Sequence, residues 1–193
     1  MKDNIIQQIQ ASIDTKQDIL KDEVLLSNIM TVAKRLIQLY RNNGKILIAG
    51  NGGSAADAQH MAAELVGRFE LERKGLPAIA LTTDSSSLTA VGNDYGYHYT
   101  FARQVEALGN ASDAFIAIST SGNSESIVNA VKAAKEQGLY CIGLTGSKAC
   151  KMDELCDIML KIPSTHTPRI QESHLLIEHM LCQIIETNLF AQH

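Results

Sequence analysis

The chain shows two hydrophobic patterns, a helical one near the N-terminus and a series of short apolar runs after it. In the first forty residues, isoleucine and leucine recur every three or four positions, which is typical of amphipathic helices. Lys21-Asp22 interrupts this pattern, and its second half ends at Asn42-Asn43-Gly44, where asparagine and glycine can adopt a left-handed helix end. We therefore predict a helical pair in residues 1–43. Because the pair precedes any strand, we expect its apolar faces to pack on the domain and on partner subunits.

Five short apolar runs follow, and each is succeeded by turn or helix residues. Runs that are apolar on both faces and alternate with helices indicate a parallel sheet covered on both sides. We predict an α/β fold, a three-layer αβα sandwich with a five-stranded parallel sheet, as a single domain over residues 1–193. The predicted strands are 45–49, 78–81, 114–118, 140–144 and 158–162, and the predicted helices are 54–69, 85–91, 100–108, 124–137 and 169–188.

Composition narrows the class of protein further. With 193 residues, 45% of them apolar and 20% charged, the chain is neither collagen-like, nor of low complexity, nor wholly disordered. No apolar run approaches the roughly 18–20 residues of a membrane span, and the first residues lack the apolar core of a signal peptide. The net charge of −4 disfavours a nucleic-acid backbone as partner. We expect a cytoplasmic protein with four reduced cysteines and neither a nucleic-acid nor a membrane partner.

Two loops at the predicted carboxyl edge of the sheet are rich in small polar residues. Gly50-Asn51-Gly52-Gly53-Ser54 follows the first strand, and Ser119-Thr120-Ser121-Gly122-Asn123-Ser124 follows the third. Glycines let backbone N–H groups approach a ligand closely, and hydroxyls at a helix N-terminus can bind an anion. Ser54 is predicted as a helix N-cap with Asp57 as its capping-box partner. Neither the Walker A motif nor the G-x-G-x-x-G spacing, which would identify a phosphate site directly, is present. The two loops are therefore either a phosphate pocket or ordinary serine-rich turns.

The helix predicted after the first loop carries a polar stripe. Asp57, His60, Glu64 and Arg68 share one face of it. His60 and Glu64, four residues apart, can reach one divalent metal or form a proton-transfer pair. A solvated face with a Glu64–Arg68 ion pair is the alternative.

The last predicted helix supplies further candidates. Gln171 and His179 are eight residues apart, about 12 Å along a helix axis. One metal could accept both only if both side chains extend toward it or if they come from different chains. His174 lies one turn beyond Gln171. We expect it, like His98, His166 and His193, to be structural or exposed.

Taken together, these segments resemble the sugar isomerase (SIS) domain family and, within it, the phosphoheptose isomerases. The likeness covers nearly the whole chain. S-T-S-G-N-S alone marks only the broad family, whereas its combination with the residues of both polar helices is far more specific. The segments that carry the resemblance are G-N-G-G-S-A-A-D at 50–57, His60-x-x-x-Glu64, Gly67-Arg68-Phe69, residues 81–84, 92–96, 119–124 and 169–172, and His179.

The resemblance implies a flavodoxin-like topology and a homotetramer with active sites between subunits. It implies conversion of sedoheptulose 7-phosphate to D-glycero-D-manno-heptose 7-phosphate through an enediol, the first step of bacterial ADP- or GDP-heptose synthesis for lipopolysaccharide or capsule. One Zn²⁺ per subunit would be held by His60, Glu64, Gln171 and His179, with Glu64 and His179 catalytic. The implied substrate contacts are Asn51, Gly52, Gly53, Glu64, Asn93, Asp94, Ser119, Thr120, Ser121, Ser124 and Gln171.

Two other functions fit the same family. One relative is a non-catalytic tetramer that binds the bacterial replication initiator, and it lacks the residues matching Glu64 and His179, both of which are present here. The other alternative is a sugar-phosphate sensor without turnover, which would not depend on Glu64. One departure from the family pattern is Pro168, where some relatives carry an acidic residue. Proline suits the first turn of a helix, but any role of that acid is absent from this chain.

Overall fold

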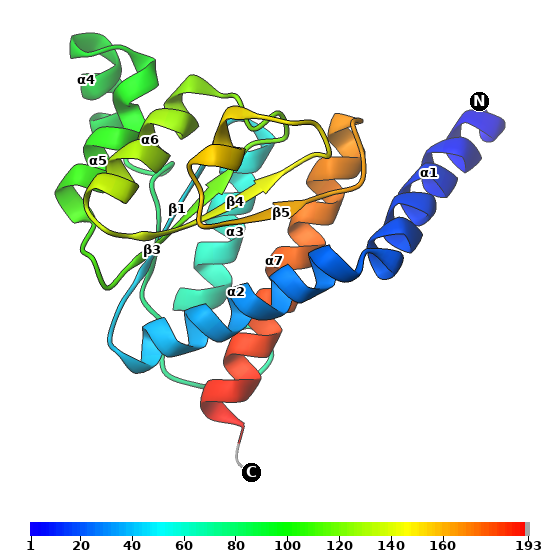
Figure 1. Cartoon of the computed structure of the whole chain (residues 1–193), viewed down its shortest axis with the longest axis horizontal. Coiled ribbons are helices and arrows are strands. Elements are labelled where there is room, and N and C mark those ends of the chain that lie inside the picture. The colour runs from blue at the N-terminus through cyan, green and yellow to red at the C-terminus, as the bar shows by residue number, and fades with distance from the viewer. Residues whose placement is uncertain (192–193) are drawn as a thin grey trace.

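The computed structural model describes residues 1–191 and contains a five-stranded, all-parallel sheet (Figure 1). Its strand order is β2-β1-β3-β4-β5, the flavodoxin-like order. The predicted α/β fold with a five-stranded parallel sheet is therefore confirmed, while His193 lies outside the described residues. The strands are β1 (Ile46–Gly50), β2 (Ala78–Ala80), β3 (Ala114–Ile118), β4 (Tyr140–Thr145) and β5 (Ile158–Lys161).

The helices occupy the predicted segments, with shifted ends. Asp22 caps the second helix by accepting a hydrogen bond from the N–H of Leu25 at 2.9 Å, and Asn43 adopts the expected left-handed conformation with φ of 60°. The α-helices are α1 (Lys2–Lys21), α2 (Glu23–Arg41), α3 (Gly53–Val66), α4 (Ser85–Asp94), α5 (Thr100–Leu108), α6 (Glu125–Glu136) and α7 (Thr167–Phe190). Two 3₁₀ turns, η1 (Tyr97–Tyr99) and η2 (Lys151–Glu154), complete the chain.

Two hydrophobic cores lie on opposite faces of the sheet. Successive side chains of a strand alternate between faces, so Ile46 and Ile48 pack with residues of α2, α3 and α7. Leu47, between them, packs on the other face with residues of α5 and α6. Every residue of β1 and of β3 is buried, as expected for strands covered on both sides. The three-layer sandwich follows from this arrangement.

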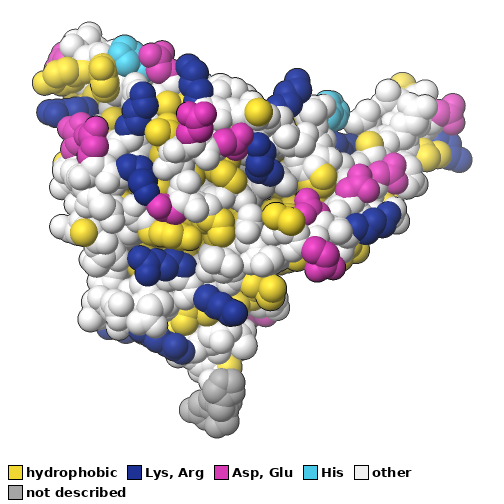
Figure 2. All heavy atoms as spheres, viewed as in Figure 1, with side chains coloured by type: hydrophobic (Ala, Val, Ile, Leu, Met, Phe, Trp, Pro, Cys, Tyr) yellow, Lys and Arg dark blue, Asp and Glu magenta, His cyan; other side chains and the backbone are white. Residues whose placement is uncertain are grey.

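The N-terminal helices differ in how they meet the body of the molecule. The apolar face of α2 is buried against the sheet, whereas α1 projects away from the body and buries only Thr15 and Ile19 (Figure 1). Ile5, Ile9 and Ile13 remain exposed on α1, where Figure 2 shows hydrophobic side chains at the surface. None of the described helices combines the length and apolar character needed to cross a membrane.

Candidate active site

The two predicted ligand loops lie side by side at the carboxyl edge of the sheet. Strands β1 and β3 are hydrogen-bonded neighbours, and the helices that follow them, α3 and α6, pack on opposite faces. Such a reversal of winding opens a crevice where open α/β sheets bind ligands. The side chain of Asn51 joins the loops by donating to Ser124 Oγ at 2.9 Å and Ser126 Oγ at 3.0 Å.

The start of α3 differs from the prediction. Gly52 is the N-cap with φ of 56°, a conformation that favours glycine, and the helix begins at Gly53 without a side-chain cap. Ser54 is therefore a buried residue of the first turn, and the predicted capping box with Asp57 is wrong. Ser124 does cap α6, but its hydroxyl accepts from Asn51 rather than from its own helix.

A cavity of about 190 Å³ lies between the two loops. Its wall offers hydroxyl and amide groups, and none of the residues that form it is acidic. The predicted binding residue Gly53 lies beside it, because a Cβ there would come within 2.6 Å of Gln171 Nε2. The structure thus gathers six of the predicted substrate contacts around one polar cavity suited to an anion. The cavity is lined by Asn51, Ser54, Ile118, Ser119, Thr120, Ser121, Ser124 and Gln171.

The second group of predicted site residues lies further along α3 and α7, which run in the same direction (Figure 1). His60 Nε2 is 3.1 Å from Glu64 Oε1 and 3.4 Å from His179 Nε2. Zinc binds imidazole nitrogen at about 2.0–2.1 Å, so the ligands of a tetrahedral ion lie about 3.3–3.4 Å apart. These spacings fit one ion, and one donor atom from each of the three residues lies within 4.8 Å of the others.

The donor atoms of this triad are also of the types that bind a divalent cation. Two imidazole nitrogens and a carboxylate oxygen can each offer a lone pair to one ion. The ring of Phe69, with its centroid 5.6 Å from that of His179, borders the cluster on its apolar side. His60 is exposed and the other two ligands are half-buried, so the triad opens toward solvent or a neighbouring molecule.

Gln171 is the one predicted metal ligand that does not join the triad within this chain. Gly53 faces Gln171, and about two turns further along each helix, His60 faces His179. With a rise of about 1.5 Å per residue, Gln171 and His179 lie about 12 Å apart along α7. The amide of Gln171 instead lines the polar cavity.

Two further carboxyl groups lie near the triad, Glu178 buried on α7 and Asp57 half-buried on α3. Glu178 is 1% exposed, and in the described residues neither of its carboxyl oxygens has a hydrogen-bond partner. Burial, with a smaller contribution from Asp57, raises the pKa of Glu178 to about 8. Burial also raises the pKa of Asp57, against the lowering effect of His60. His174 is fully buried as well, and burial lowers its pKa to about 4, which keeps it neutral.

Several side chains lie elsewhere than the spacing alone indicated. Asn93 and Asp94 are exposed at the end of α4 and line neither the polar cavity nor the triad. Tyr97, which the sequence analysis missed, donates from its hydroxyl to Asn51 Oδ1 at 2.6 Å. Tyr97 directly follows residues 92–96, a segment that carries the family resemblance, and this position could have indicated a place near the site. Arg68 pairs with Glu72 at 3.8 Å rather than with Glu64.

Comparison with known proteins identifies the family of this chain. A family model described as a SIS domain matches residues 9–146. The chain is 55% identical over 190 residues to a phosphoheptose isomerase from Aneurinibacillus thermoaerophilus, covering 98% of this chain and 96% of the relative. It is 52% identical over 191 residues to another from Sulfurimonas denitrificans, covering 99% and 98%.

Solved structures give the same result. The phosphoheptose isomerase from Neisseria gonorrhoeae superposes with a TM-score of 0.91 at 44% identity, covering 96% of this chain and 98% of that one. The enzyme from Francisella tularensis gives 0.92 at 42% identity, covering 96% and 97%. Sequence and fold therefore show that this chain belongs to the SIS domain family, among the phosphoheptose isomerases.

Proposed function

We propose that the protein converts sedoheptulose 7-phosphate to D-glycero-D-manno-heptose 7-phosphate. The observation that carries the proposal is the convergence of His60, Glu64 and His179, from two separate helices, in a chain whose relatives are phosphoheptose isomerases. Turnover in the cytoplasm, as the first step of bacterial heptose synthesis for lipopolysaccharide or capsule, is part of the same proposal.

The polar cavity is the proposed site of the substrate's phosphate group. Ser119, Ser121 and Ser124 offer hydroxyls there, and α6 begins directly after Ser124, so its N-terminal N–H groups favour an anion. Asn51, held by Tyr97 and Ser124, gives this end of the cavity a fixed shape. Binding energy from the phosphate would then position the distant reacting carbons.

The reaction requires proton transfers at two adjacent carbons. A proton leaves C1 and another is delivered to C2, while a proton moves from the C1 hydroxyl to the C2 carbonyl oxygen. Glu64 is the proposed base: its Oε1 faces His60, which leaves Oε2 for the carbon proton. His179 is the proposed acid–base partner for the oxygens, because an imidazole carries two ring nitrogens that can donate or accept a proton.

The triad also fits one zinc ion per subunit, by its ligand types and by its spacings of 3.1 and 3.4 Å. His60, Glu64 and His179 would hold the ion, and Gln171 is the proposed fourth ligand. A bound zinc ion would polarise the substrate's oxygens as a Lewis acid. Burial raises the pKa of Glu178, the neighbour of His179 in α7, and so disfavours a further carboxylate charge behind the triad.

A homotetramer with active sites between subunits completes the proposal. Gln171 and the triad are separated along α7, so a second chain that brings its own triad to the polar cavity would place all four ligands together. The exposed isoleucines of α1 form an apolar stripe of the kind that marks an interface. Light scattering at micromolar concentration tests this directly, and a monomer would contradict it.

The decisive experiment is incubation of the purified protein with sedoheptulose 7-phosphate, with the product identified by NMR. We expect the aldose phosphate to form, turnover to fall after chelation, and zinc to restore it. Absence of any aldose product from zinc-loaded protein would refute the assigned reaction. Full turnover in metal-free protein would refute only the role of zinc.

A further inference from the structure

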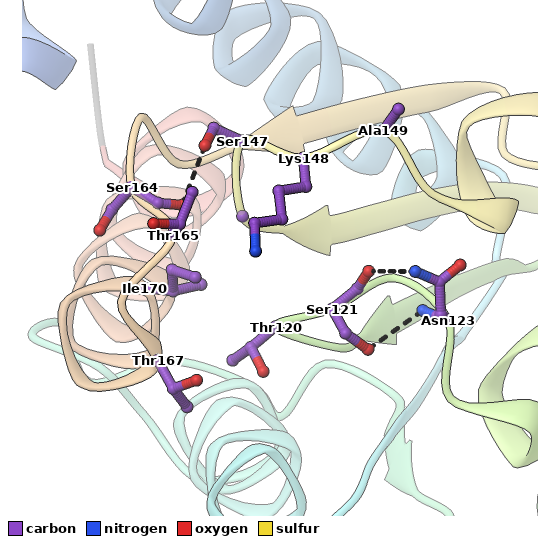
Figure 3. A pocket seen from close by; sticks show the side chains of 11 residues that line it. Thr120, Ser121, Asn123, Ser147, Lys148, Ala149, Ser164, Thr165, Thr167 and Ile170 are labelled. Carbon is purple, nitrogen blue, oxygen red and sulfur yellow. Dashed lines mark hydrogen bonds between the residues drawn. The ribbon is translucent and has the colours of Figure 1, made fainter.

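A second cavity, of about 270 Å³, lies on the other side of the loop that follows β3 (Figure 3). It shares Thr120 and Ser121 with the polar cavity. Its remaining wall comes from residues 146–149 after β4, from Ser164 and Thr165 before α7, from Thr167 and Ile170 of α7, and from Asn123. The proposed isomerase reaction makes no use of this space.

The charge of this second cavity comes from Lys148. Figure 3 shows the lysine ammonium group directed into the cavity, between the loop of Thr120 and the start of α7. Among residues 1–191, Lys148 makes no ion pair and no side-chain hydrogen bond, and no acidic residue lines the wall. The cavity therefore has a net positive charge, which the protein itself does not neutralise.

Three threonines also belong to the wall of this cavity. Thr120, Thr165 and Thr167 line it, and within the described chain none of their hydroxyls donates to another residue. The 24-residue helix α7 begins at Thr167, so its positive end adds to the field of Lys148. By contrast, the hydroxyl of Ser147 is already engaged with the carbonyl of Ser164 at 3.2 Å. A cation, three free hydroxyls and a helix N-terminus together match the oxygens of a phosphate group.

We propose that this cavity is a second anion subsite, which takes inorganic phosphate or the phosphate group of a small ester. Each chain would then bind two phosphate groups, one on either side of Thr120 and Ser121. Because the two subsites share these hydroxyls, occupancy of the Lys148 subsite would alter the donors available to the substrate's phosphate. The proposal does not depend on the isomerase activity, since direct binding tests it.

Equilibrium dialysis of the full chain against radiolabelled inorganic phosphate measures the number of sites. The parent protein is expected to bind two phosphates per chain. Lys148→Ala should weaken one site at least about tenfold, the loss expected when a charged hydrogen bond is removed, and leave the other unchanged. Lys151→Ala is the matched control, because this exposed lysine is nearby but does not line the cavity. Ser124→Ala should weaken only the other site, since Ser124 lines the polar cavity alone.

The source of the phosphate group is distinguished by competition. Glycerol 3-phosphate that displaces labelled phosphate from the Lys148 subsite in the Ser124→Ala protein would indicate an ester ligand, and failure to displace it would indicate inorganic phosphate. A parent protein whose phosphate binding is weakened by Ser124→Ala but unchanged by Lys148→Ala would overturn the proposal. So would equal losses in Lys148→Ala and Lys151→Ala, which would reflect only a general loss of positive charge.

Discussion

Glu186 anchors the chain segment that follows α3, and its removal is the perturbation with the largest expected cost. Its carboxylate accepts hydrogen bonds from the backbone N–H groups of Phe69, Glu70 and Leu71 at 3.0, 2.7 and 2.8 Å. Arg73 Nε donates to the same carboxylate at 2.8 Å, and both side chains are only 2% exposed. The substitution Glu186→Ala therefore leaves the buried guanidinium of Arg73 without its counter-charge and the three N–H groups without their acceptor.

Arg73 extends this arrangement to helix α3. Its guanidinium donates to the carbonyls of Glu64 at 2.8 Å, Leu65 at 2.6 Å and Gly67 at 3.1 Å. These carbonyls belong to the end of α3, where a helix has no intrahelical donors left. The Glu186–Arg73 pair thus holds the last turn of α3, and with it the backbone of Glu64.

The size of the effect follows from this burial. Breaking a buried ion pair by removing one partner costs about 3–5 kcal/mol of folding free energy. In a chain of this length, each kcal/mol lowers the melting temperature by about 2–4 °C. We therefore expect Glu186→Ala to melt about 6–20 °C below the parent protein. Glu186→Gln keeps the shape of the side chain but not its charge, so its melting temperature should lie between those of the parent and Glu186→Ala.

Circular dichroism melts at pH 7.5, with all variants at one protein concentration, measure this difference. Glu72→Ala is the matched control, because its ion pair with Arg68 is exposed and 3.8 Å long, and such pairs contribute little. A melting temperature for Glu186→Ala within 2 °C of the parent would refute the reasoning. Equal shifts in Glu186→Ala and Glu72→Ala would refute the assignment of the effect to burial.

The same carboxylate makes a pH prediction. Burial alone would raise the pKa of Glu186, but the N–H groups of Glu70, Leu71 and Phe69, together with Arg73, lower it below its usual range. A lowered pKa in the folded state stabilises the protein above the unfolded value of about 4.3. That contribution decreases as the pH falls below this value and is lost as the pH passes through the folded-state pKa. The stability difference between the parent and Glu186→Gln should shrink accordingly in acid.

The remaining predictions concern the site. Glu64→Gln should fold normally and lose isomerase activity by at least about a hundredfold, the typical contribution of a general base; turnover at the parent rate would exclude Glu64 as the base. His60→Ala and His179→Ala should each lower the zinc content of purified protein, and unchanged stoichiometry by elemental analysis would count against the triad as ligands. Glu178 binds a proton in the folded state up to about pH 8, which the unfolded chain releases near 4.3, so urea unfolding should show stability falling between these values. In Glu178→Gln, the free energy of unfolding should depend less on pH over this range. An equally steep pH dependence in this variant would assign the effect to another titrating group.

Local sequence patterns were sufficient to predict the elements of the fold, because burial on one or both sides dictates which positions are apolar. The run at 114–118, apolar throughout, became β3 without a shift in either end. The helix end at Asn43 followed from the residue's tolerance of a left-handed backbone. The start of α3 was predicted one residue late, since Gly52 initiates the helix through a backbone conformation that no side-chain pattern reveals.

The two ligand loops illustrate the boundary between local and tertiary information. Their composition identified them as candidates, and their positions after strands placed both at one edge of a sheet. Only the strand order β2-β1-β3-β4-β5 makes them neighbours, because it is set by which strands pair over long distances rather than by any local segment. The bonds from Asn51 to Ser124 and from Tyr97 to Asn51 follow from that pairing.

The residues, their spacing and the family resemblance were enough to select His60, Glu64, Gln171 and His179 as a group. Only the tertiary structure decides which of the four side chains lie together. Helices α3 and α7 pack in the same direction, so residues at similar distances from the two helix starts face each other. His179 consequently meets His60, while Gln171 stays opposite Gly53 in the polar cavity. The burial of Glu178 and the direction of Lys148 into a second cavity likewise depend on what surrounds them, which a one-dimensional pattern of polar and apolar residues does not contain.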